Sequence, residues 1–193
     1  HYLWNKPGLR TPAGLLIACA VAMAPLAVFG IQDWAGWWID NVRPGTMRDY
    51  YIWIKGGWVP MEIATVLVAA IALYVYPYPF IVAIAALALW FFSMDIAALV
   101  VSKVELDYTS TWNLKRAATQ WFGFGLVLVA WFVDLRKRAE DFAFWLHLAG
   151  ITAFWGAVTS NYSDSEVAKA IYCLMNIGLA MLGIFLSRRI YAV

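Results

Sequence analysis

The residues of this sequence that could do chemistry are acids placed inside otherwise apolar stretches. Asp95 stands in LWFFSMDIAALVV, residues 89–101, and Glu62 stands in WVPMEIATV, residues 58–66. A charged side chain at the centre of a bilayer costs ~2.5–3.5 kcal/mol on insertion scales, so such groups are usually paired or take part in ion and proton pathways. The two acids therefore indicate a proton site, a cation site or a buried ion pair.

The spacing of these acids places them at the same depth. The sequence YPYP, residues 76–79, ends a helix because proline has no backbone N–H to donate, and we expect a tight turn there. Glu62 lies sixteen residues before Tyr78 and Asp95 lies seventeen after it, so an antiparallel helical hairpin brings them to equal height. Two carboxylates at one level in low dielectric cannot both ionise cheaply. We expect one of them to hold a proton, or a cation or basic side chain to lie between them.

The fourth apolar stretch supplies candidates to complete this group. The third and fourth stretches form the next hairpin, which places Asp95 opposite about Gly123. Gln120 then lies one turn nearer the outer side, and Lys115 and Arg116 lie at the outer start of the fourth stretch as candidate partners. The predicted intramembrane polar cluster is therefore Glu62, Asp95, Arg116 and Gln120. Further basic candidates are Lys103 and Lys55.

Plainer interpretations of both acids stay open. Glu62 follows Pro60, and proline at the first helical position with an acid in the first turn is typical of an ordinary helix start. Asp95 could form a structural pair with Arg116 or a serine, or contact another subunit. The pattern alone does not separate these roles from a proton or cation site.

Two other polar residues inside apolar stretches are His147 and Asn176. Hairpin spacing places His147 opposite about Leu128 and Ala180, so we expect no acid beside it. We interpret His147 as a packing or lipid-facing residue. Ligation of a pigment, haem or metal is the alternative, although haem needs a second axial ligand or an open distal pocket. Asn176 is expected to hydrogen-bond across helices.

The amino-acid composition indicates which secondary structure positions these polar residues. The chain has 193 residues, of which 64% are hydrophobic and 13% charged, whereas soluble domains have about 45–50% and about 25%. Stretches of about 20 apolar residues are long enough to span a bilayer. We therefore predict an all-α membrane protein, a single domain over residues 1–193 with a bundle of about six transmembrane helices. The expected spans are 13–31, 60–76, 80–101, 117–133, 142–160 and 167–187.

The segment 32–59 is the longest connection and is rich in tryptophan and tyrosine. These side chains favour the membrane–water interface because each has an apolar body and a polar edge. We predict an interfacial segment on the outer side of the membrane. An aromatic binding platform is the alternative interpretation.

Motifs and charge narrow the functional class. The sequence contains no GxxxxGK[ST], HExxH, CxxC or GxSxG, so we expect no catalytic residues, no metal and no cofactor. A net charge of +2 without a basic stripe gives no reason to expect nucleic acid. We predict a non-enzymatic integral membrane protein, a structural or accessory component of a larger assembly, with lipid and other membrane subunits as partners. The alternative is a proton- or cation-coupled transporter or channel-like protein that uses Glu62 and Asp95.

Four longer segments carry a resemblance. YIWIKGGWVPMEIAT, LWFFSMDIAAL, EDFAFWLHLAGITAFWG and SDSEVAKAIYCLMNIGLAMLGIFLSRR resemble an uncharacterised family of polytopic bacterial inner-membrane proteins, a domain of unknown function. Members of that family look longer, with further spans on both sides, so the resemblance implies that this chain is an internal segment. It also implies a bacterial cytoplasmic membrane, and it transfers no catalytic residue.

The orientation of the bundle follows from the positive-inside rule. The strongest short basic loop is Arg136-Lys137-Arg138, which we place in the cytoplasm together with both ends of the chain. A cysteine introduced at Ser110 should then react with a membrane-impermeant maleimide added outside, and one introduced at Lys137 should not. The reverse labelling pattern would refute this orientation.

Overall fold

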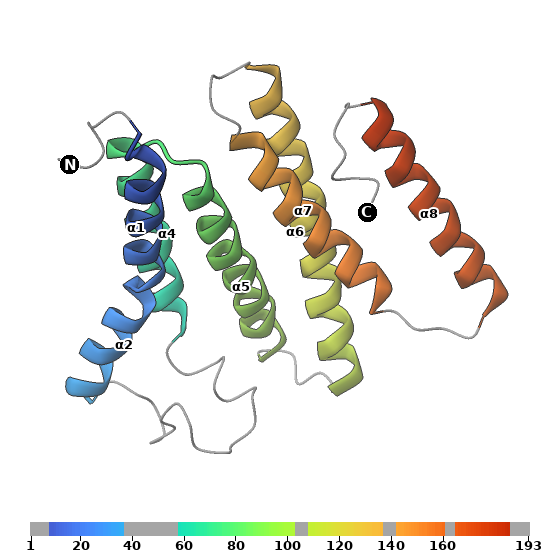
Figure 1. Cartoon of the computed structure of the whole chain (residues 1–193). Coiled ribbons are helices and arrows are strands. Elements are labelled where there is room, and N and C mark those ends of the chain that lie inside the picture. Colours follow the sequence, from blue (N-terminus) through green and yellow to red (C-terminus); the bar gives the residue numbers. More distant parts are fainter. Residues whose placement is uncertain (1–7, 37–57, 103–107, 137–141, 161–164, 186–193) are drawn as a thin grey trace.

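The computed structural model describes residues 8–36, 58–102, 108–136, 142–160 and 165–185, and these segments form helices joined by turns (Figure 1). The helices alternate in direction along the chain, so that consecutive spans are antiparallel neighbours. Their bounds are α1 Arg10–Ala22, α2 Ala24–Trp34, α4 Trp58–Val75, α5 Phe80–Ser102, α6 Tyr108–Leu135, α7 Phe142–Thr159 and α8 Glu166–Phe185.

Five of the described helical segments are long and apolar enough to cross a membrane. They are Arg10–Trp34, which joins α1 and α2, and then Trp58–Val75, Phe80–Ala97, Trp112–Leu135 and Phe142–Thr159. Helix α8 coincides with the sixth predicted stretch, 167–187. The prediction of an all-α membrane bundle is confirmed. Helices suit a bilayer because their backbone N–H and C=O groups hydrogen-bond to one another, and the apolar side chains can then face the lipid.

The first span is broken in its middle. Helix α1 ends at Ala22, Met23 stands between the helices, and α2 begins at Ala24 with Pro25 in its first turn. Proline has no N–H for the carbonyl of Val21, and its ring crowds that carbonyl, so an uninterrupted helix is disfavoured at this point.

One hydrophobic core joins α1 to the α4–α5 hairpin. Its buried members are Ala18, Val21, Ala69 and Ile81, from the three helices. The hairpin turns through 76–79, as the two prolines predict. The ring of Tyr78 in this turn lies on α1, where a side chain on Gly14 would collide with it. We call this end of the bundle the Tyr78 end and the opposite end, where α4 begins, the Trp58 end (Figure 1).

Helices α6 and α7 make the most extensive helix–helix contact of the described chain and cross each other (Figure 1). At the crossing, a Cβ on Gly123 would collide with the backbone of Phe154, and a Cβ on Gly150 would lie 2.9 Å from Val127 N. Only glycine lets two helix backbones approach this closely. The buried face of α7 is formed by Ala143, His147, Gly150, Ala153 and Ala157.

The predicted interfacial segment 32–59 overlaps helices at both of its ends. Gln32 and Trp34 belong to α2, and Trp58 begins α4. Residues 37–57 lie outside the described part of the chain. The interfacial placement of these residues therefore stays a prediction.

The α6–α7 crossing can be tested with two neighbouring glycines. Gly123→Ala should lower the free energy of unfolding by about 1–3 kcal/mol, because its methyl group must push into the α7 backbone. Gly125→Ala is the matched control: its added Cβ meets nothing within 4 Å, so better helix propensity should leave stability unchanged or raised. Thermal unfolding in detergent measures both variants. Equal effects would contradict the close crossing.

Candidate intramembrane ionisable site

Three neighbouring helices each bury one ionisable side chain. Glu62 on α4 is 6% exposed, Asp95 on α5 is 4% exposed and Lys115 on α6 is 4% exposed. Helix α4 packs on α5, and α5 packs on α6. All three residues lie toward the Trp58 end of their helices (Figure 1). We call Glu62, Asp95 and Lys115 the ionisable cluster.

Glu62 lies deeper in its helix than the sequence suggested. Helix α4 begins at Trp58, two residues before Pro60, so Glu62 stands beyond the first turn. It shares the buried face of α4 with Met61, Thr65 and Ala69. The side chain therefore points into the bundle and does not serve as an exposed acid at the helix start.

Electrostatic interactions connect the three members of the cluster. Asp95 interacts with Glu62 on one side and with Lys115 on the other. One oxygen of each acid, Glu62 Oε2 and Asp95 Oδ2, is buried without a hydrogen-bond partner among the described residues. Buried polar atoms are nearly always satisfied, and an exception indicates an unseen water, ion or proton, or a functional role. The cluster thus has unused capacity to accept a hydrogen bond or a proton.

A neighbouring hydrogen bond fixes the contact between α5 and α6. The indole Nε1–H of Trp90 donates to Thr119 Oγ1 at 3.2 Å. Thr119 follows Lys115 by one helical turn, so both lie on the same face of α6. Ser93 closes the arrangement on α5 by donating to the carbonyl of Trp90 at 2.7 Å. The Trp90–Thr119 bond holds the face of α6 that carries Lys115 toward α5.

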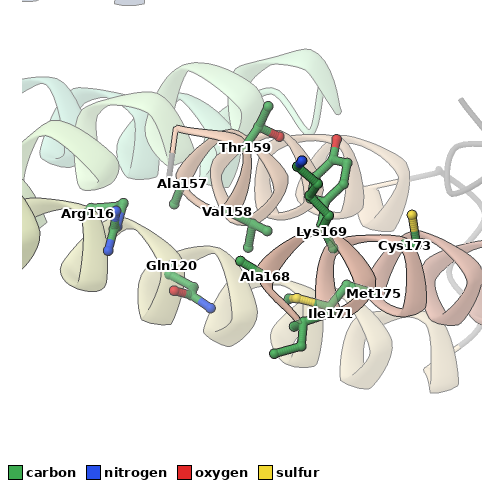
Figure 2. A pocket seen from close by; sticks show the side chains of 11 residues that line it. Arg116, Gln120, Ala157, Val158, Thr159, Ala168, Lys169, Ile171, Cys173 and Met175 are labelled. Carbon is green, nitrogen blue, oxygen red and sulfur yellow. The ribbon is translucent and has the colours of Figure 1, made fainter. Parts of the chain in front are cut away.

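The structure places Arg116 and Gln120 away from the ionisable cluster. They line a cavity of about 610 Å³ bounded by α6, the end of α7 and α8 (Figure 2). The basic residue beside Asp95 is Lys115, one position earlier in the sequence. Adjacent helical residues point about 100° apart because a turn holds 3.6 residues, so one position decides which neighbour a side chain meets.

The expectation that no acid lies beside His147 is wrong, and so is a lipid-facing His147. The side chain is fully buried, and its Nε2 lies 3.0 Å from Asp134 Oδ2 as donor to the carboxylate. Residues at equal distance from a turn lie at equal height only when the two helix axes are aligned. The axis of α6 instead crosses that of α7. The crossing brings Asp134, near the end of α6, within reach of His147.

Asn176 joins α8 to α7. Its Oδ1 accepts a hydrogen bond from Trp155 Nε1 at 3.1 Å, and its Nδ2 donates to the carbonyl of Tyr172 at 2.9 Å. This is the cross-helix role expected from the sequence.

Sequence reasoning gave no role to Gln32, which is a buried polar residue on α2. Helix α2 packs on α4, the helix that carries Glu62. The burial of Gln32 was not expected, because polar residues at the end of an apolar stretch usually lie at the membrane–water interface.

The donor set of the cluster is poor for a metal ion. Within the described ranges, no group of three or more His, Cys, Asp and Glu side chains could hold one. The positive charge of Lys115, which interacts with Asp95, would also repel a metal ion. The arrangement is suited to exchanging a proton: two carboxylates and one ammonium carry a formal charge of −1, and one added proton makes the cluster neutral.

Comparison of the chain with family models, with curated proteins and with solved structures finds no match. Function must therefore be argued from the geometry.

Lys115 and Arg116 offer a direct test of the cluster. Lys115→Met should lower the free energy of unfolding by about 3 kcal/mol, because removing one partner of a buried pair leaves Asp95 uncompensated. Arg116→Met makes the same chemical change one position away and should cost less than about 1 kcal/mol. The double variant Lys115→Met/Asp95→Asn should regain part of the loss. A larger effect at Arg116 than at Lys115 would show that the pairing is misassigned.

Proposed function

We propose that this multi-pass membrane protein exchanges protons at the ionisable cluster, as part of a proton-coupled transport function. One observation carries the proposal: Glu62 and Asp95 are buried side by side, and each has a buried oxygen without a hydrogen-bond partner among the described residues. Ionisable residues inside transmembrane helices mark proton and ion pathways in general.

The charge balance favours a proton over a metal cation. Lys115 already supplies one positive charge to Asp95, so the cluster needs a single further charge to become neutral in the low dielectric of the bundle. A proton supplies that charge on a carboxylate oxygen without needing a coordination shell. A bound sodium ion would face the ammonium group of Lys115.

A cluster that only held the helices together would not need two acids and one base. A single Asp95–Lys115 pair would link α5 and α6, and a second acid adds repulsion unless it is neutralised. Glu62 is therefore a surplus group for a purely structural pair. Its presence beside Asp95 supports a site that gains and loses a proton.

A second candidate function is a structural or accessory component of a larger membrane assembly. One observation favours it: the two cavities found beside α8 are lined by neither Glu62 nor Asp95. In this case the cluster would hold α4, α5 and α6 together in a closed state, and its protons would not be exchanged.

We further propose a bacterial cytoplasmic membrane, with both ends of the chain on the cytoplasmic side. The basic residues at 136–138 and the resemblance noted above support this placement. Figure 1 shows α1 beginning and α8 ending at the same end of the bundle, which fits such an arrangement.

A proton-flux assay separates the two functions. Protein in liposomes carrying an internal pH dye should acidify the lumen faster than protein-free liposomes when an inward proton gradient is imposed. Glu62→Gln and Asp95→Asn keep the side-chain size but remove the titrating group, so the flux should fall to the protein-free level. The matched control is Asp33→Asn, which makes the same change at an exposed acid of α2 and should keep the flux.

Thermal unfolding of the same samples completes the assay. Folded variants with lost flux support proton exchange. If wild-type protein shows no flux above the protein-free level, or if the two cluster variants keep full flux, the proton-exchange proposal is wrong and the accessory role is favoured.

A further inference from the structure

A groove runs along α8 where this helix faces α6 and α7. Its wider part has a volume of about 610 Å³, and a second part of about 260 Å³ continues between the same helices, with Met175 lining both. Figure 2 shows the wider part, with Arg116 and Gln120 projecting from α6 and Lys169 from α8. Within the described chain, α8 packs extensively on no other helix and is tied to α7 by the Trp155–Asn176 bond.

The lining of the groove changes from cationic to apolar along its length. Arg116 and Lys169 line the wider part, near the Trp58 end of the bundle. The second part is lined by Phe124, Val127, Ile151, Phe154, Met175, Gly178 and Leu179. Phe124 follows Arg116 by eight residues and Gly178 follows Lys169 by nine, so at 1.5 Å per residue the apolar part begins about 12 Å deeper.

Arg116 and Lys169 both lie at the depth of a lipid headgroup. Arg116 lies one turn inside the candidate span Trp112–Leu135, and Lys169 lies in the first turn of α8. Lys169 forms a pair with Glu166 at 2.9 Å, but both side chains are more than half exposed. Exposed ion pairs contribute little stability, so Lys169 can turn to another anion at low cost.

The size of the groove separates its possible occupants. Its wider part is far larger than the ~30 Å³ occupied by one water molecule in the liquid, and its deeper lining offers almost no polar partner for water. It is also far smaller than a transmembrane helix, which is about 30 Å long and 10–12 Å wide. An extended alkyl chain with a charged head fits both the dimensions and the change from cationic to apolar lining.

We propose that this groove binds one anionic phospholipid, with its phosphate group at Arg116 and Lys169 and an acyl chain along the apolar part toward Gly178. The site is separate from the ionisable cluster and does not depend on proton exchange. The bound lipid would fill the space between α8 and the α6–α7 pair. Contacts with this lipid would then hold α8 in place together with the Trp155–Asn176 hydrogen bond.

The test compares phosphatidylglycerol with phosphatidylcholine. Wild-type protein in detergent should bind one phosphatidylglycerol more tightly than phosphatidylcholine by native mass spectrometry, and phosphatidylglycerol should raise its melting temperature more. Arg116→Gln and Lys169→Gln should each weaken phosphatidylglycerol binding by about fivefold, as expected for one cation near an anionic lipid. Their combination should remove the preference. Arg136→Gln, at the opposite end of α6, is the matched control and should leave it unchanged.

A second variant tests the apolar part of the groove. An added Cβ at Gly178 meets nothing within 4 Å, so Gly178→Leu should fold while filling the space of the acyl chain. It should weaken binding of both lipids without changing the preference between them. Equal wild-type affinity for the two lipids, an unchanged preference in the double charge variant, or a second copy of the chain in place of lipid would each overturn the proposal.

Discussion

The interaction on which the rest of the structure depends is the electrostatic pairing of Asp95 with Lys115. It compensates a buried acid on α5 and, together with the Trp90–Thr119 hydrogen bond, holds one face of α6 toward α5. Once Lys115 faces α5, the next residue, Arg116, must face elsewhere, and the structure places it beside α8. The rotation of one helix thus separates an interior charge cluster from a cationic groove, although the two basic residues are neighbours in sequence.

Much of the fold could be predicted from the sequence, because its determinants are local. Apolar length identifies the helices, and the prolines near residue 78 and at Pro25 mark the turn and the break. The site was harder to predict, since it depends on helix rotation and crossing. The four-residue spacing of Thr119 and Gly123 could have identified the inward face of α6, because small residues repeat along such a face, and Lys115 lies one turn before Thr119 on it. No local pattern shows that α6 crosses α7, so the contact of Asp134 with His147 was missed.

Two ionisable contacts lie at opposite ends of the bundle and differ in composition. The cluster at the Trp58 end holds two acids for one base, whereas Asp134 and His147 form a pair of one acid and one base near the Tyr78 end. A one-to-one pair can satisfy its own charges. The unequal cluster cannot, and this inequality is the physical reason why proton exchange is proposed at that end of the molecule.

The break at Met23 divides the first span into two rods with different attachments. Helix α1 is locked at the Tyr78 end by Ala18, Val21 and the ring that rests on Gly14. Helix α2 packs beside α4, near the end of the molecule that holds Glu62. The two halves of the first span are therefore held by different neighbours: the bend at Met23 lets α1 pack against the Tyr78 turn while α2 packs against the helix that carries Glu62.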